Sequence, residues 1–87
     1  MTPVLTDPRL KRLRMRAWHR GTKEMDLILG GFVDSQAASL SEANLLALEK
    51  LMAENDNDLY LWVSGAQEKP IQHTEIIEQI QRFHEIS

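Results

Sequence analysis

The sequence predicts an all-α fold, a compact single-domain bundle of about five short helices. Apolar residues recur at the spacing of a helix face, whereas the alternation that is typical of strands is almost absent. Capping residues, glycines and prolines divide the 87 residues into short segments. A chain of this length supports one domain, which we assign to residues 1–87 with an ordered core at about residues 7–86.

The first helix is predicted to begin after Asp7, whose carboxylate suits an N-cap, with Pro8 at the first helical position. Gly21 is expected to end this helix, because glycine adopts the left-handed backbone conformation that other residues resist. The apolar residues of the segment fall on one face, at Leu10, Leu13, Ala17 and Trp18.

The second helix is predicted to begin near Thr22. Glu24 then lies in its first turn, where the exposed amides and the helix dipole favour a carboxylate. Its apolar content is Leu27, Ile28 and Leu29. The adjacent Gly30 and Gly31 should weaken or bend the helix, because each glycine costs about 1 kcal/mol relative to alanine in a helix interior.

A third helix should begin at Ser41 and run to about Glu54. Ser41 has the side chain of an N-cap, and the preceding Leu40 can pack against Leu45 as a hydrophobic staple. The apolar positions Leu45, Leu48, Leu51 and Met52 have helical spacing. If Leu48 is buried as this spacing predicts, replacing it by alanine should lower the free energy of unfolding by about 2–5 kcal/mol.

Two further helices are predicted in the last third of the chain. Asp56 is expected to cap a short helix that Gly65 closes from the C′ position. After Pro70 restarts the chain, a final helix should extend close to the C-terminus. The apolar residues of these two helices are Leu59, Trp62 and Val63, then Ile76, Ile77, Ile80 and Phe83. We expect Trp62 to belong to the core, because large aromatic side chains dominate burial in small domains.

The composition excludes several classes of protein. The absence of cysteine excludes disulfides, thiolate metal sites and a cysteine nucleophile. No run approaches the roughly 18 apolar residues needed to span a bilayer, and no secretory signal is recognisable, so we expect a soluble cytoplasmic protein without membrane insertion. The acidic stretch at residues 54–58 lacks the later ligands of a calcium loop, and the histidines lack metal-ligand spacing. We therefore expect no metal site.

Size and chemistry also argue against an enzyme. A domain of 87 residues has little material with which to build both a core and a cavity for a dinucleotide. The sequence contains no recognisable pair of nucleophile and base. We therefore expect no catalytic residues, and we expect the chain to act on the surface of a larger partner.

Charge is divided unevenly along the chain. Residues before Glu24 carry seven bases against Asp7 alone, whereas the remainder carries twelve acids against three bases. Such opposite fields favour oriented docking to a partner of matching polarity. The basic first helix also leaves open a different class of function, an antitoxin-like or nucleic-acid-associated helical protein. The acidic remainder opposes broad tracking of a phosphate backbone, so we expect no nucleic-acid partner.

One motif gives a more specific indication. The order Arg20-Gly21-x-x-Glu24-x-Asp26, then Leu40-Ser41, then Asp56-x-Asp58-Leu59-x-x-Trp62 and Gly65, resembles the SdhE family of FAD assembly factors. The resemblance covers roughly Asp7 to Phe83. Members of this family are small helical proteins that promote covalent attachment of FAD to the flavoprotein subunit of succinate dehydrogenase.

The resemblance implies a function and a set of partners. The chain would be an assembly chaperone for the flavoprotein subunit of succinate dehydrogenase, with fumarate reductase as a further candidate client. FAD would be attached to the partner, and this chain would bind no cofactor tightly. We expect a monomer when free, located in the cytoplasm or, in a eukaryote, in the mitochondrial matrix.

The resemblance also assigns candidate partner-binding residues, for which simpler interpretations exist. Arg20 would offer a planar fork to a carboxylate or carbonyl, Gly21 would allow close backbone approach, and Glu24 would supply the opposite charge. Arg20 and Glu24 could instead form an exposed ion pair with i,i+4 spacing. Asp26 and Asp58 complete the set, and either could be a first-turn acid that complements its helix dipole.

Overall fold

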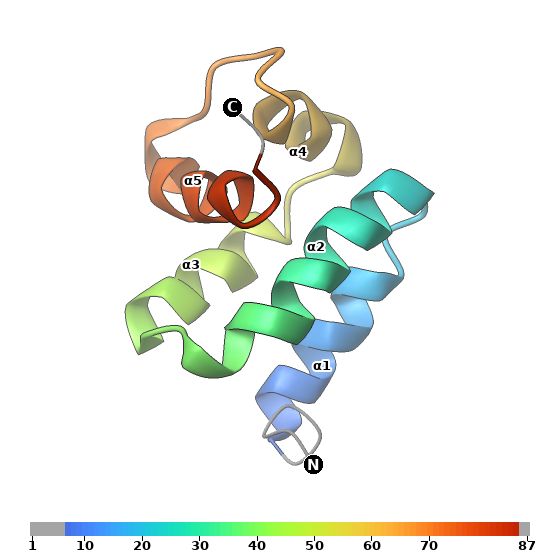
Figure 1. Cartoon of the computed structure of the whole chain (residues 1–87), viewed down its shortest axis with the longest axis vertical. Helices are drawn as coiled ribbons and strands as arrows, with labels where there is room; N and C mark the ends of the chain where they lie inside the picture. The colour runs from blue at the N-terminus through green and yellow to red at the C-terminus, as the bar shows by residue number, and fades with distance from the viewer. Residues whose placement is uncertain (1–6, 86–87) are drawn as a thin grey trace.

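The computed structural model describes residues 7–85 and confirms the all-α prediction (Figure 1). Five α-helices and two short 3-10 helices make up the described part of the chain, which contains no strand. The predicted ordered core ends at residue 86, one residue beyond the described range. In chain order the elements are α1 (Pro8–Trp18), α2 (Lys23–Gln36), η2 (Ala37–Ser39), α3 (Glu42–Leu51), α4 (Asp56–Val63), η3 (Ile71–His73) and α5 (Thr74–Phe83).

The helices form two groups along the longest axis of the molecule. Helices α1 and α2 lie side by side as an antiparallel hairpin, and α4 and α5 pack together at the other end (Figure 1). Helix α5 also contacts α2 and α3, so it joins the hairpin to the rest of the bundle. The principal extents are 37 × 26 × 23 Å. No helix in the described range is long and apolar enough to cross a membrane.

The buried side chains form one cluster to which all five α-helices contribute. Leu48 is fully buried, and Trp62 is 9% exposed, as the helical spacing predicts. Of the apolar residues noted in the second helix, Leu29 is fully buried, whereas Leu27 is 52% exposed. The cluster consists of Leu10, Leu13, Ala17, Met25, Leu29, Phe32, Val33, Ala37, Leu45, Leu48, Leu51, Met52, Leu59, Trp62, Val63, Ile76, Ile77 and Ile80.

Side-chain caps fix where the helices begin. The Asp7 carboxylate accepts hydrogen bonds from the backbone amides of Arg9 and Leu10, at 2.8 and 3.4 Å. Thr22 caps α2 through the amide of Met25, at 3.3 Å. Ser41 caps α3 in the same way. The predicted starts of the first three helices are therefore confirmed.

The predicted cap of the fourth helix is wrong by one residue. Asn55, rather than Asp56, is the N-cap of α4, and its side-chain oxygen accepts from the amide of Asp58 at 2.9 Å. Asp56 is the first residue of the helix, and its carboxylate is used elsewhere. At the other end of α4, Gly65 has a φ of 84° and occupies the C′ position after Ser64, as predicted.

The adjacent Gly30 and Gly31 do not interrupt α2, which continues without a break to Gln36. Gly30 lies under the indole ring of Trp18, where an added Cβ would come within 2.4 Å of the ring carbons. The indole Nε1 of Trp18 donates a hydrogen bond to Asp34 at 3.1 Å, which fixes the ring over the glycine. Gly30 therefore allows close packing of α1 on α2, and this packing stabilises the helix despite its low intrinsic propensity.

Two helices end earlier than predicted, and the short connections that result lie close together. Helix α1 ends at Trp18, so residues 19–22 link it to α2. Helix α3 ends at Leu51, so residues 52–55 link it to α4. Hydrogen bonds from Arg20 join the first link to the second, and they position the candidate site.

Candidate functional site

The candidate site is built on the link between α1 and α2. Gly21 in this link has a φ of 106°, a left-handed conformation that favours glycine, as predicted. The chain reverses direction here, so the beginning of α2 lies beside the end of α1 (Figure 1). Within the link, Gly21 is exposed, whereas the side chain of the preceding Arg20 is only 12% exposed.

The guanidinium of Arg20 is engaged within the chain. Its Nε donates to the Asp56 carboxylate at 2.8 Å, and its two terminal nitrogens donate to the backbone carbonyls of Met52 and Glu54 at 2.7 and 2.8 Å. The interpretation of Arg20 as a fork directed at a partner therefore needs correction, because the fork binds this chain's own α3–α4 link. The alternative of an exposed pair with Glu24 is also wrong, since the ionic partner of Arg20 is Asp56.

We call Arg20 and its three acceptors, Asp56, Met52 and Glu54, the Arg20 cluster. This cluster is connected to the start of the last helix. The Glu54 carboxylate lies 2.8 Å from Nε2 of His73, which is 5% exposed. The His73 ring also lies near Trp62, with ring centroids 5.8 Å apart. Since the Glu54 carbonyl accepts from Arg20, one short segment connects the α1–α2 link to the start of α5. The link therefore has a fixed position relative to the core.

Asp26 and Asp58 have structural roles in the same region. The Asp26 carboxylate accepts from the backbone amide of Arg20 at 2.7 Å and so closes the link from the α2 side. The Asp58 carboxylate accepts from the side-chain amide of Asn55 at 2.8 Å, in return for the hydrogen bond that caps α4. Both acids are half-buried. Each lies in the first turn of its helix, as the simpler interpretation of these residues predicts.

Glu24 differs from the other charged candidates because its side chain is exposed. It lies in the first turn of α2, where the N-terminal amides favour a carboxylate. Within residues 7–85, Glu24 forms no ion pair and no side-chain hydrogen bond. Of the five candidate residues, Gly21 and Glu24 are therefore the two whose surfaces are open to a partner.

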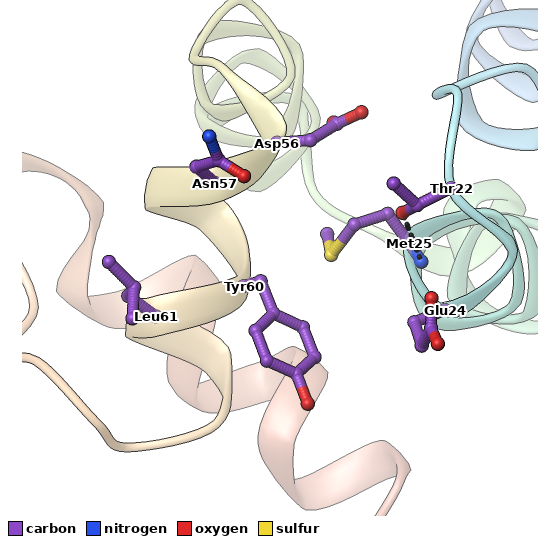
Figure 2. A pocket seen from close by; sticks show the side chains of 7 residues that line it. All are labelled: Thr22, Glu24, Met25, Asp56, Asn57, Tyr60 and Leu61. Atoms are coloured by element: carbon purple, nitrogen blue, oxygen red, sulfur yellow. Dashed lines mark hydrogen bonds between the residues drawn. The ribbon is translucent and has the colours of Figure 1, made fainter.

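A surface groove adjoins these two residues, between α2 and α4 (Figure 2). Its volume is about 660 Å³. Tyr60 extends from α4 into the space beside Glu24, and Met25 lies between the two helices (Figure 2). The lining residues are Thr22, Glu24, Met25, Asp56, Asn57, Tyr60 and Leu61.

Sequence reasoning did not assign Tyr60 and Leu61 to a site, although a signal was present. If Leu59, Trp62 and Val63 face the core, the helical repeat directs the two residues between them outward. Their side chains are in fact 47% and 36% exposed. The helical repeat therefore predicts that these two large residues lie on the outer face of α4.

The basic residues of the first helix are partly neutralised within the chain. Arg9 forms ion pairs with Glu42 and Glu49, both at 2.8 Å, and Arg14 pairs with Asp34 at 2.7 Å. The hydrogen bond from Arg9 is the main reason that the pKa of Glu49 lies below its ordinary value, and burial opposes this shift. These pairs reduce the positive surface available to a phosphate backbone.

The family described as flavinator of succinate dehydrogenase matches residues 11–84. The FAD assembly factor SdhE of Legionella pneumophila strain Lens is 34% identical over 71 residues, which cover 82% of this chain and 90% of that protein. No solved structure matched the chain.

Other relatives are longer than this chain. The FAD assembly factor SdhE of Acetobacter pasteurianus is 39% identical over 57 residues, or 66% of this chain and 52% of the relative. The mitochondrial succinate dehydrogenase assembly factor 2 of Candida glabrata is 31% identical over 84 residues, or 91% of this chain and 55% of the relative. The matches thus span about half the length of these two proteins. Since the family match covers most of the chain, the chain belongs to the flavinators of succinate dehydrogenase.

Proposed function

We propose that this protein binds the flavoprotein subunit of succinate dehydrogenase and promotes the covalent attachment of FAD to that subunit. The observation that carries the proposal is the family match over residues 11–84. The relatives are named as assembly factors rather than as catalysts, which supports assistance to a reaction that occurs on the partner. The same names favour this function over an antitoxin-like or nucleic-acid-associated one.

The geometry of the α1–α2 link supports a mechanism based on conformational selection. The Arg20 cluster ties the α1–α2 link to the α3–α4 link, so Gly21 and Glu24 are held on a rigid body. A rigid surface that fits the competent conformation of the flavoprotein better than its open conformation shifts the equilibrium by that difference in affinity. The flavoprotein then forms its own bond to the flavin.

The candidate residues divide into contact residues and positioning residues. Gly21 and Glu24 contact the partner, because their surfaces are open. The positioning residues are Arg20, Asp26 and Asp58. Their hydrogen bonds fix the α1–α2 link or the start of α4, and thereby the position of the contact residues. FAD is held by the flavoprotein, and this chain binds no cofactor tightly.

The proposal extends to the setting in which the protein acts. It acts as a monomer in the cytoplasm of a bacterium, or in the mitochondrial matrix of a eukaryote. We propose the flavoprotein subunit of fumarate reductase as a second client. Bacterial and mitochondrial relatives support these locations.

The test measures covalent flavin on the partner subunit by its fluorescence in denaturing gels. Cells that lack this protein should be complemented with wild type, Glu24→Ala or Gly21→Arg. Glu75→Ala is a matched control, because Glu75 is likewise an exposed acid in the first turn of a helix, on α5. We expect wild type and the control to restore flavin fluorescence, and the two site variants to restore little.

Two results would contradict the proposal at different levels. If wild type gave no increase in covalent flavin, the function itself would be wrong. If wild type acted but folded Glu24→Ala and Gly21→Arg acted equally well, the assignment of the contact surface would be wrong. Circular dichroism of each variant establishes that it is folded. This check matters for Gly21, whose φ of 106° strains any other residue.

A further inference from the structure

The groove beside Glu24 continues along α4. A second hollow of about 440 Å³ shares Glu24 and Tyr60 with the first. We call the two hollows together the α2–α4 groove. The additional residues that line it are Leu27 and Ile28 from α2, with Val63 and Ser64 from the end of α4.

The α2–α4 groove concentrates exposed apolar surface. Leu27, Tyr60 and Leu61 line it and are 52%, 47% and 36% exposed. The other large exposed apolar residues of the described chain, Met15, Leu46 and Ile71, line neither hollow. Exposed apolar side chains that share a groove are typical of a protein-binding surface, whereas scattered ones are not.

The charges of the groove have one sign. Two of its lining residues are acids, Glu24 and Asp56, and none of the described lining residues is Lys or Arg. Asp56 is already paired with Arg20, so Glu24 supplies the uncompensated negative charge. Asp56 lines only the first hollow, whereas Glu24 lines both.

We propose that the α2–α4 groove takes a segment of the flavoprotein subunit that carries a large apolar side chain next to a Lys or Arg. This inference rests on the proposed function and names the chemistry of its contact. The apolar side chain packs on Leu27 and Tyr60, where it is removed from water. The cation pairs with Glu24, the charge that the groove leaves open.

The test is the affinity of the purified flavoprotein subunit for this protein, measured at low and at high salt. Leu27→Ser and Tyr60→Ser should each weaken binding by about tenfold or more, as expected for residues at the centre of an interface. Leu46→Ser is the matched control, since Leu46 is 45% exposed but lies on α3, outside the groove. We expect its affinity to remain within about twofold of wild type.

Glu24→Gln tests the charge separately from the shape. The amide keeps the size of the side chain, so binding should weaken mainly at low salt, and the salt dependence of the affinity should decrease. Tyr60→Phe removes only the hydroxyl group and should retain most of the affinity, because the ring provides the packing. Since all these side chains are exposed, unchanged thermal unfolding should accompany each result.

The outcomes separate this inference from the function on which it rests. If wild type binds the flavoprotein and promotes flavin attachment but the groove variants bind equally well, the groove inference is overturned and the function stands. An unchanged salt dependence for Glu24→Gln overturns the assignment of a cation to this position. If wild type itself neither binds nor promotes flavin attachment, the proposed function is overturned as well.

Discussion

Two arginines fix the two ends of α1, and they do so in different ways. Near the N-terminus, Arg9 is 27% exposed and bridges to two carboxylates of α3, Glu42 and Glu49. Just beyond the C-terminus, Arg20 is 12% exposed and combines the Asp56 carboxylate with two backbone carbonyls. Because these carbonyls belong to the backbone, the hydrogen bonds of Arg20 fix the backbone of the α3–α4 link relative to that of the α1–α2 link.

The difference explains why only one end of the hairpin suits a rigid contact surface. Exposed ion pairs contribute little because water competes for both charges and long side chains lose entropy. Hydrogen bonds from a largely buried guanidinium to main-chain carbonyls constrain geometry more strongly, and their loss leaves polar groups without partners. Gly21 and Glu24 lie beside the rigid cluster. The Arg9 cluster, which consists of Arg9, Glu42 and Glu49, holds α1 against α3 less rigidly than the Arg20 cluster holds the two links.

Among the changes that test this comparison, Arg20→Ala has the largest expected effect. This change removes the hydrogen bonds to Asp56, Met52 and Glu54 and leaves these acceptors in a partly buried site. The free energy of unfolding should decrease by about 2–4 kcal/mol. Denaturant titration measures it. Flavin attachment should also decrease at temperatures where the variant remains folded, because the link loses its fixed position.

Arg20→Lys distinguishes geometry from charge. Lysine retains the positive charge but cannot direct three donors to one carboxylate and two carbonyls at once. We expect it to recover less than half of the stability lost in Arg20→Ala. If Arg20→Lys were as stable as wild type, the positive charge of Arg20 rather than its hydrogen-bond geometry would account for its contribution to stability.

The sequence was sufficient to predict the helices but not the direction of the Arg20 side chain. Caps, glycines and apolar spacing are local signals, so the starts of α1, α2 and α3 could be predicted from neighbouring residues. Arg20 and Asp56 lie 36 positions apart, and their pairing depends on how two links meet in space. No local pattern carries that information, and Glu24 at i,i+4 was the nearest apparent partner.

Gly30 in the α1–α2 hairpin illustrates the same limit. Two adjacent glycines lower helix propensity, which is why a bend was predicted. Helix α2 nevertheless continues through both glycines, and Gly30 packs against the Trp18 ring. The sequence of α2 alone gives no indication of this contact with α1. The motif did identify Gly21 and Glu24, whose surfaces the structure leaves open, but it gave no indication of the neighbouring Tyr60 and Leu61.

Gly30→Ala is the next largest prediction, and it sharpens the comparison by loosening the hairpin without altering either arginine. The added Cβ would lie 2.4 Å from the Trp18 ring, so the ring or the helix must move. The net loss of stability should be about 1–3 kcal/mol despite the better helix propensity of alanine. Thermal unfolding monitored by circular dichroism measures it.

Gly31→Ala is the matched control for this change. An added Cβ there lies 3.5 Å from the nearest atom of His84, an ordinary contact. The substitution should stabilise the protein by up to about 1 kcal/mol through helix propensity alone. Opposite signs for two adjacent glycines would establish that the Trp18 contact, rather than propensity, explains the effect. Equal signs would refute that explanation.

Arg9→Ala tests the weaker cluster directly. It removes the ion pairs with Glu42 and Glu49. The side chains of these two glutamates are 70% and 28% exposed. We expect a loss of stability roughly a third or less of that for Arg20→Ala, because solvent screens exposed pairs. Flavin attachment should remain close to wild type. A loss as large as that for Arg20→Ala would remove the distinction between the two clusters.

The smallest expected effect is the pH dependence of the Arg9 cluster. The hydrogen bond from Arg9 lowers the pKa of Glu49 in the folded protein below its ordinary value of 4.5. Folding therefore disfavours protonation of this group. Its contribution to stability is fully present above that ordinary value and is lost as the pH falls through the lowered pKa. At neutral pH, Glu49→Gln should cost at most about 1 kcal/mol, since the pair is partly exposed.

Measuring this variant at two pH values tests the assignment. The difference in unfolding free energy between wild type and Glu49→Gln should be largest near neutral pH and should shrink at a pH well below 4.5, where Glu49 is protonated. Glu78→Gln, at an exposed position of α5, is the control for replacing a glutamate by its amide. High salt should reduce the Glu49 effect as well. A difference that is independent of both pH and salt would mean that Glu49 stabilises the fold through packing rather than through its charge.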